Sequence, residues 1–204
     1  MVDVDVARRA GWTPVDLARA YLDGGARLLQ IRAKQLGSGP FLELCDAVVN
    51  AGSLYGALVI VNDRADLAGM SGAAGVHVGQ EDLPPAMARQ LLGRDAIVGV
   101  STHSVSQIAA VVREPISYIA VGPVFGTHTK DTGYHPVGLD LVSTAVRLAE
   151  GTPVVAIGGI TLENAKSVLD AGAASVAVIR DLLATHDPAG RTLAYLQRLA
   201  QHRV

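Results

Sequence analysis

The sequence has little of what marks several large classes of protein. A single cysteine, Cys45, excludes an intrachain disulfide and a metal site built from several cysteines. The formal net charge is only −2, without an acidic or basic block, which argues against a general nucleic-acid-binding or membrane-surface role. The six histidines lack the paired spacing of a transition-metal site on a helix. Nucleic acid and membrane are therefore not the expected partners, and a homo-oligomer stays open.

Long apolar runs are also missing. None approaches the length of a transmembrane helix, and the longest strand-like run covers only residues 57–61. The first residues, MVDVDVARRAGW, lack the apolar stretch of a signal peptide. We therefore expect a cytoplasmic protein. Because half of the 204 residues are hydrophobic, we expect residues 1–204 to form one domain.

What the sequence does contain is a repeating alternation of short apolar runs with segments of helical periodicity. The runs are continuously apolar, as in parallel strands that are covered by helices. Eight such runs alternating with about eight helices predict a (β/α)8 TIM barrel. A doubly wound open sheet remains the alternative, because alternation does not show closure. The expected strands are Val2–Val6, Leu28–Ile31, Ala57–Val61, Gly75–Val78, Ile97–Val100, Tyr118–Val121, Val154–Ile157 and Ser175–Ile179, the first of them short or incomplete.

Cationic and amide side chains follow the second expected strand. Alternation along the strand places Gln30, Arg32 and Lys34 on one side, facing the mouth of the barrel. Two cations and an amide that converge there are suited to phosphate oxygens. The alternative is a solvated strand end with ordinary surface charges.

Carboxylates follow the next two strands. Asn62 and Asp63 end the third strand, and Asp82 follows the fourth. Two carboxylates opposite a cationic strand could hold Mg²⁺ while phosphate oxygens complete its shell. The alternative is that each aspartate caps the helix that follows it, Asp63 a short helix over 64–70 and Asp82 a helix near Leu83.

Hydroxyls and glycines follow the later strands. Ser101 could donate to a phosphate, and Ser104 is expected to cap the next helix. His77 and His103 are interpreted as structural. Gly158 and Gly159 precede a helix expected over 161–170, where exposed backbone N–H groups could bind phosphate, although tight turns also require glycine. The loop 126–133, GTHTKDTG, contains one of only three lysines in a chain with fourteen arginines.

Taken in order, these motifs resemble the thiamine phosphate synthase family over about residues 24–182. The resemblance rests on six motifs at successive strand ends: Gln30-x-Arg32-x-Lys34, Asn62-Asp63, Gly79-Gln80-Glu81-Asp82, Ser101-x-His103, Thr127-x-Thr129-Lys130 and Ile157-Gly158-Gly159-Ile160. It implies a barrel that joins hydroxymethylpyrimidine diphosphate to a carboxylated thiazole phosphate. The implied products are thiamine monophosphate, pyrophosphate and carbon dioxide.

The resemblance also implies roles for individual residues. The pyrimidine diphosphate would be bound by Gln30, Arg32, Lys34, Asn62, Ser101 and Lys130. Mg²⁺ on that diphosphate would be held by Asp63 and Asp82, and the thiazole phosphate would be bound by Thr127, Thr129, Gly159, Ile179 and Arg180. The family is held to expel pyrophosphate before the thiazole nitrogen attacks. Such a step needs charge neutralisation and alignment more than acid–base groups.

The chain departs from the family pattern at three places. Arg180 stands where serine is usual, Gly126 stands where proline is common, and the first strand is shorter than expected. A related thiazole tautomerase, which isomerises a thiazole phosphate without condensing it, is the nearest alternative. The resemblance disfavours it because Asp63, Asp82 and Lys130 are all retained. A phosphate-binding barrel without catalytic activity is the other alternative.

Overall fold

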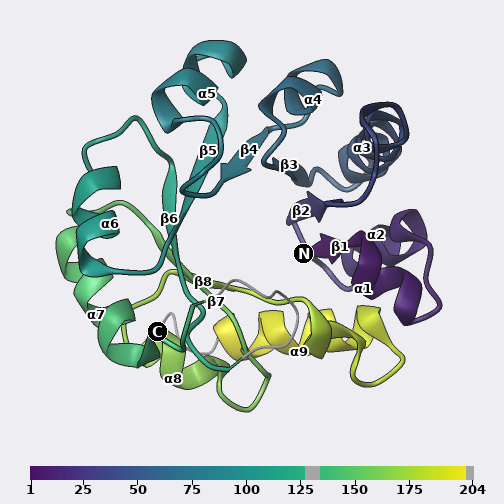
Figure 1. Cartoon of the computed structure of the whole chain (residues 1–204). Helices are drawn as coiled ribbons and strands as arrows, with labels where there is room; N and C mark the ends of the chain where they lie inside the picture. Colours follow the sequence, from purple (N-terminus) through teal and green to yellow (C-terminus); the bar gives the residue numbers. More distant parts are fainter. Residues whose placement is uncertain (127–133, 201–204) are drawn as a thin grey trace.

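Eight parallel strands form one sheet that curls into a (β/α)8 barrel. The computed structural model describes residues 1–126 and 134–200. The strands pair in chain order from the first to the eighth, and helices form an outer ring around them (Figure 1). Their bounds are β1 (Val2–Asp3), β2 (Leu28–Arg32), β3 (Leu58–Asn62), β4 (Gly75–Val78), β5 (Ile97–Thr102), β6 (Tyr118–Val121), β7 (Val154–Ile157) and β8 (Ser175–Ala177).

The sequential strand order distinguishes the barrel from the alternative fold. A doubly wound sheet reverses its strand order partway along the chain, whereas here each strand pairs with the one before and the one after it. The two edge strands are bridged where the Met1 nitrogen donates to the Val178 carbonyl at 3.1 Å. The barrel expected from the sequence is thus the observed fold.

Helices follow most strands and cover the outside of the sheet. They are α1 (Val4–Arg9), α2 (Pro14–Asp23), α3 (Ser38–Ser53), α4 (Ala65–Met70), α5 (Pro85–Leu92), α6 (Val105–Val111), α7 (Gly138–Leu148), α8 (Ala165–Asp170) and α9 (Pro188–Ala200), with a 3₁₀ turn η1 (Arg180–Leu183). Outward-facing strand residues such as Ile31, Val61 and Val98 are fully buried against this layer. Burial of such side chains supplies the main stabilisation of the fold.

The first strand was predicted too long. Only Val2–Asp3 pairs with β2, and residues 4–9 form α1 instead of continuing the expected strand to Val6. The reason is local, because the Asp3 carboxylate accepts a hydrogen bond from the Val6 amide at 3.1 Å and so caps the helix. The last strand likewise ends at Ala177 rather than Ile179.

Two helix caps expected from the sequence have different outcomes. Ser104 caps α6 by accepting from the Gln107 amide at 3.3 Å, as predicted. The helix expected to begin at Thr161 begins at Ala165, because Thr161 and Asn164 first close a turn in which the Thr161 amide donates to Asn164 Oδ1 at 2.8 Å.

Within residues 1–126 and 134–200, no helix is long and apolar enough to cross a membrane.

Candidate functional site

The cationic side chains after β2 lie at the inner side of the barrel mouth. Leu29, Ile31 and Ala33 are buried against helices, so Gln30, Arg32 and Lys34 share the opposite side of the strand, as their alternation predicts. Arg32 donates to the Asp3 carboxylate at 2.6 Å, across the neighbouring β1. Asp3 is 2% exposed, so this pair fixes the guanidinium beside the mouth.

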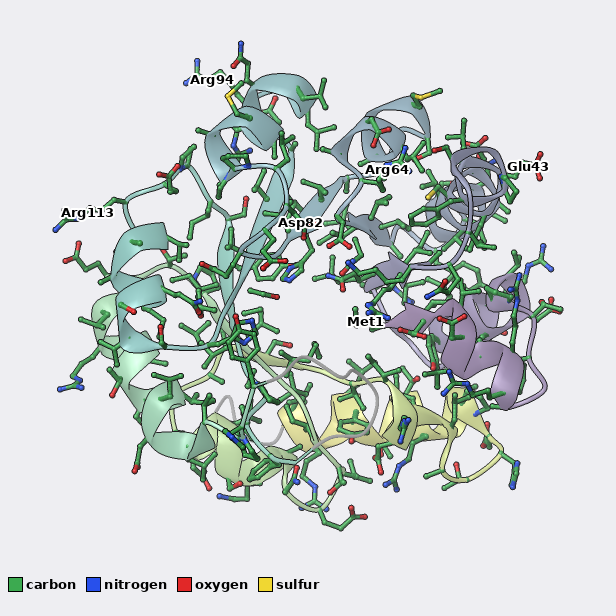
Figure 2. The ribbon with its side chains drawn as sticks, viewed as in Figure 1. Met1, Glu43, Arg64, Asp82, Arg94 and Arg113 are labelled. Atoms are coloured by element: carbon green, nitrogen blue, oxygen red, sulfur yellow. The ribbon has the colours of Figure 1, made fainter. Side chains whose placement is uncertain are left out.

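The two carboxylates predicted as metal ligands lie together. The Asp63 side chain pairs with the Lys34 ammonium and lies within hydrogen-bonding reach of the Asp82 carboxyl. Burial raises the pKa of Asp63 above its usual range; Lys34 opposes this rise, and Asp82 adds to it. In Figure 2, Asp82 faces the inside of the ring, whereas Glu43, Arg94 and Arg113 point outward. Two crowded carboxylates beside a cation form a site at which a divalent ion would relieve repulsion.

Neither aspartate caps a helix, so the structural alternative for both is wrong. The cap position of α4 belongs to Arg64, and Asp63 has a φ of 66°, which places it in the left-handed region. Pro84 precedes α5, and Asp82 instead accepts from the Gly79 amide at 2.8 Å. The left-handed backbone at Asp63 is a strained conformation of the kind found at functional sites.

A chain of hydrogen bonds crosses the barrel interior beneath this mouth. Gln30 donates to the Tyr118 hydroxyl, and that hydroxyl lies 2.8 Å from Nδ1 of His77. On the other side, His77 Nε2 lies 2.8 Å from the Ser101 hydroxyl oxygen. Because Gln30 occupies the Tyr118 oxygen as donor, the tyrosine hydrogen points to Nδ1, and Nε2 is left to donate to Ser101. The Ser101 hydrogen is then directed away from His77.

A glycine leaves space for this series of hydrogen bonds. A side chain at Gly99 on β5 would collide with the Tyr118 ring, which lies over that position. The His77 and Tyr118 rings stack with centroids 5.6 Å apart. Sequence reasoning interpreted His77 as structural and did not single out Tyr118. The only signal in the sequence was polar residues inside otherwise apolar strands.

A cavity of about 420 Å³ opens beside Ser101, between the ends of β5, β6, β7 and β8. Its lining includes Ser101 and His103 at the end of β5, Gly158–Gly159 after β7 and Ile179–Arg180 after β8. His103 Nδ1 lies 2.5 Å from the Gly122 carbonyl oxygen, and its ring stacks on Tyr134 with centroids 3.8 Å apart. Residues that the sequence assigned to two different substrates therefore line one cavity.

The Gly158–Gly159 turn lines this cavity and packs closely against the loop after β6. Both residues have positive φ, 99° and 64°. A β-carbon at Gly158 would lie 2.5 Å from Pro123 Cα, and one at Gly159 would lie 2.5 Å from the Gly126 carbonyl oxygen. Glycine is thus required both for the backbone conformation and for the approach of the loop after β6.

The loop after β6 is fixed on both sides of its polar motif. The Val124 amide donates to the Ile157 carbonyl at 2.9 Å, and the Phe125 amide donates to Gly158 at 3.0 Å. On the far side, the Val137 amide donates to the Pro123 carbonyl at 2.8 Å. Thr127, Thr129 and Lys130 themselves lie outside the described residues, and Gly126 stands at the cavity edge next to them.

Other predicted residues have simpler placements. Asn62 is buried at the end of β3, where it pairs in register with His77 of β4. Arg180 is the first residue of η1 and lies at the cavity through its position after Ile179. In the part of the chain that the structure describes, no group of three or more His, Cys, Asp or Glu comes together as a metal site. Any divalent ion here would be held by the two carboxylates and by ligand oxygens.

Known proteins match this chain over nearly its whole length. The family model of thiamine monophosphate synthase matches residues 5–182, which include every strand except β1. A thiamine-phosphate synthase of Acidothermus cellulolyticus is 42% identical over 198 residues, 97% of this chain and 92% of that protein. One of Koribacter versatilis is 44% identical over 192 residues, 92% of this chain and 87% of that protein. The solved thiamine phosphate pyrophosphorylase from Pyrococcus furiosus superposes with a TM-score of 0.85 at 29% identity, over 93% of this chain and 91% of that chain.

Proposed function

The chain belongs to the thiamine monophosphate synthase family, and we propose that its barrel mouth joins a pyrimidine diphosphate to a thiazole phosphate. It is an enzyme, a transferase of the thiamine-phosphate synthase class. The products are thiamine monophosphate and pyrophosphate, with carbon dioxide where the thiazole carries a carboxylate. The observation that carries the proposal is the shared cavity, which Ser101 lines together with Gly159 and Arg180.

The pyrimidine diphosphate is assigned to the β2–β5 side of the mouth. Arg32 and Lys34 supply positive charge for the diphosphate oxygens, and Gln30, Asn62 and Ser101 supply polar contacts. Lys130 completes this set from the loop outside the described residues. The buried hydrogen bonds through Tyr118 and His77 support the proposal because they fix the orientation of Ser101 and Gln30, two residues assigned to the pyrimidine diphosphate.

Magnesium is part of this proposal, and the residues present suit it. Asp63 and Asp82 offer adjacent hard oxygen ligands, and the pKa of Asp63, raised mainly by burial and further by Asp82, marks a carboxylate whose charge a divalent cation would stabilise. Mg²⁺ held there would neutralise charge on the departing diphosphate. Lys34, which pairs with Asp63, would have to share that carboxylate or turn to the phosphate oxygens.

The thiazole phosphate is assigned to the backbone side of the cavity. Gly159, Ile179 and Arg180 offer main-chain contacts there, and Thr127 and Thr129 would add hydroxyls from the neighbouring loop. A dianion held against this wall lies across the cavity from Ser101. The thiazole nitrogen would therefore face the pyrimidine methylene, and proximity alone contributes much of the rate acceleration of such a transfer.

The bonds that change make modest demands on acid–base groups. The methylene carbon–oxygen bond breaks with its electron pair going to pyrophosphate, and the thiazole nitrogen lone pair forms the new carbon–nitrogen bond. Where the carboxylate is present, the carbon–carbon bond breaks to release carbon dioxide, and the ring carbon that keeps the electron pair takes up a proton from water. The chain supplies charge for the leaving group, alignment of the two rings and exclusion of water.

One assay tests the proposal. The protein is incubated with both substrates and Mg²⁺, and thiamine monophosphate and pyrophosphate are measured together. We expect equal amounts of the two products and no product when Mg²⁺ is removed by a chelator. Absence of thiamine monophosphate at every Mg²⁺ concentration would refute the synthase proposal, and isomerised thiazole alone would indicate the tautomerase. A cytoplasmic location belongs to the same proposal.

A further inference from the structure

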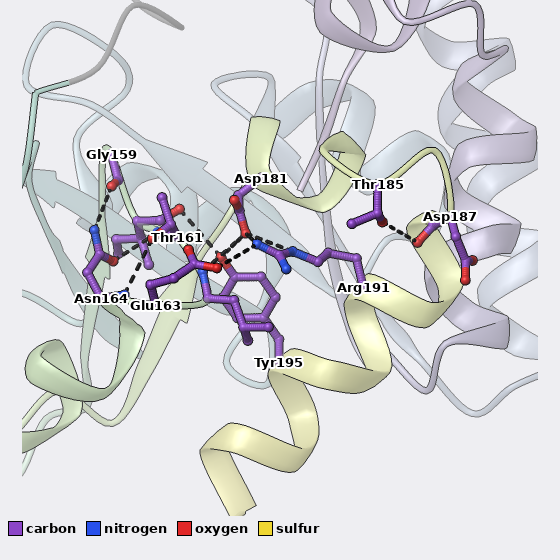
Figure 3. Close-up of polar contacts among 11 residues, drawn as sticks. Gly159, Thr161, Glu163, Asn164, Asp181, Thr185, Asp187, Arg191 and Tyr195 are labelled. Carbon is purple, nitrogen blue, oxygen red and sulfur yellow. Dashed lines mark hydrogen bonds and ion pairs between the residues drawn. The ribbon is translucent and has the colours of Figure 1, made fainter.

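One carboxylate oxygen beside the cavity accepts hydrogen bonds from two other segments of the chain, so that three segments meet there. Asp181 Oδ2 accepts from the Tyr195 hydroxyl at 2.6 Å and from the Leu162 amide at 3.2 Å. It also accepts from Nη2 and Nε of Arg191 at 2.8 and 3.1 Å. Figure 3 shows Arg191 and Tyr195 reaching this carboxylate from α9. A largely buried oxygen with four hydrogen bonds to it is held in place and is not a solvated surface charge.

Two of the three segments that meet at Asp181 line the cavity on the side assigned to the thiazole phosphate, and the third is α9. Leu162 lies three residues after Gly159, Asp181 directly follows Arg180, and Arg191 and Tyr195 lie on α9 outside the barrel. The Asp181 carboxylate therefore ties the β7 loop to the β8 loop at a single atom. The β7 loop is braced a second time where the Asn164 amide group donates to the Gly159 carbonyl at 3.1 Å.

We propose that Asp181 is a positioning residue for the thiazole phosphate, setting the spacing between the backbone at Gly159 and the backbone at Ile179–Arg180. The inference rests on the proposed function. Backbone N–H groups cannot reorient by changing rotamer, as side chains can. Their spacing therefore depends on the contacts that hold the two loops. A displacement of about 1 Å at such a site costs up to about a hundredfold in rate.

The charge of Asp181 fits this role. An unpaired carboxylate beside a phosphate would repel it, but the Arg191 guanidinium pairs with Asp181 and balances its charge. Both side chains are largely buried, at 14% and 13% exposure, so the pair is shielded from competing water. Arg191 also reaches Glu163 in the same β7 loop, but at 3.5 Å and at an exposed carboxylate, so this contact holds the loop more weakly than the contacts of Asp181 do.

Three variants test the inference. Asp181→Ala removes the acceptor, and Asp181→Asn keeps an oxygen but loses the charge. Glu163→Gln is the matched control, because it neutralises the other carboxylate on the same arginine. The Michaelis constant for each substrate and calorimetric binding of the thiazole phosphate are measured for all three and for the unmodified chain. We expect Asp181→Ala to weaken both thiazole phosphate measures by about tenfold, Asp181→Asn by less, and Glu163→Gln by less than about twofold.

The inference is decided by whether the Michaelis constants for the two substrates change by different amounts. If Asp181 served only to dock α9, its loss would lower stability without a selective change, so a Michaelis constant for the pyrimidine diphosphate that rises equally overturns the inference. An unchanged thiazole phosphate affinity in Asp181→Asn overturns it as well, and that variant suffices if Asp181→Ala does not fold. If the unmodified chain turns over but the variants bind like it, only this inference fails. If the unmodified chain neither turns over nor binds thiazole phosphate, the proposed function fails too.

Discussion

The two sides of the barrel mouth are built from different chemistry. The β2–β4 side presents charged side chains, Arg32, Lys34, Asp63 and Asp82, which contact or face one another across strand ends. The β6–β8 side presents backbone, brought close by glycines. Side chains can turn to follow a ligand, whereas backbone groups must be placed by the fold. The first side should therefore be sensitive to which functional group is present, and the second to the space that a substitution takes.

The largest effect is expected from Asp63 on the charged side. Asp63→Asn should lower magnesium-dependent turnover by about a hundredfold to a thousandfold, because the amide is a poorer ligand and leaves leaving-group charge less neutralised. The measurement is a titration of turnover with Mg²⁺. Asp66→Asn is the matched control, since Asp66 is more exposed and pairs with Arg64 at 2.5 Å. A magnesium response of Asp63→Asn equal to that of the control would remove Asp63 from the metal site.

The backbone side should fail through packing instead. Gly158→Ala places a β-carbon 2.5 Å from Pro123 Cα at a φ of 99°, so it combines strain with collision. We expect the free energy of unfolding to fall by about 3 kcal/mol. Gly11→Ala is the matched control because its φ is also positive, at 78°, and nothing lies within 4 Å. It should cost only about 1 kcal/mol. Equal losses in denaturant unfolding would show that space at the β7 turn is not limiting.

The charged side was the more predictable of the two. Alternation along β2 placed Gln30, Arg32 and Lys34 on one side, and the carboxyl ends of neighbouring parallel strands brought Asp63 near Asp82. Two details escaped prediction there. The positive φ of Asp63 depends on its tertiary contacts, and the Asp3–Arg32 pair joins residues 29 positions apart. Local patterns carry no information on either.

The backbone side was predictable only as a glycine turn. Its glycines were visible in the sequence, but what they approach, Pro123 and Gly126, was not. The Asp181 contacts with Leu162 and Tyr195 connect residues 19 and 14 positions apart, which no periodicity reports. Polar side chains at strand ends can be predicted from residue type alone. The position of backbone groups that depend on packing cannot be predicted in this way.

A smaller effect should come from Asp3, which holds Arg32 in place on the charged side. Asp3→Asn keeps an oxygen to cap α1 but weakens the pairing of Arg32, which lies 2.6 Å away. We expect the Michaelis constant for the pyrimidine diphosphate to rise about tenfold, while that for the thiazole phosphate stays within about twofold. Asp16→Asn is the control, since it weakens an exposed aspartate–arginine pair that does not include Arg32. Equal changes for both substrates would show that the two sides are not independent.

The smallest effect is expected from Asp63→Asn in the absence of Mg²⁺, where the variant should be more stable than the unmodified chain. Burial raises the pKa of Asp63 and Asp82 adds to the rise, so without Mg²⁺ the ionised carboxylate destabilises the fold. This cost is absent below the unfolded-state pKa and grows as pH rises through the higher folded-state pKa. Asparagine does not titrate, and it tolerates the positive φ of 66° at this position.

Asp63→Asn should therefore raise the free energy of unfolding at about pH 7 in chelator by at most about 1 kcal/mol, since solvent screens the partly exposed site. The difference should shrink at about pH 4, near the usual carboxyl pKa. Added Mg²⁺ should stabilise the unmodified chain but not the variant. Urea unfolding under these conditions measures all three. A variant less stable than the unmodified chain in chelator would show that the Lys34 pair outweighs the crowding of the carboxylates, so that this side of the mouth, like the glycine side, is optimised for folding as well as for binding.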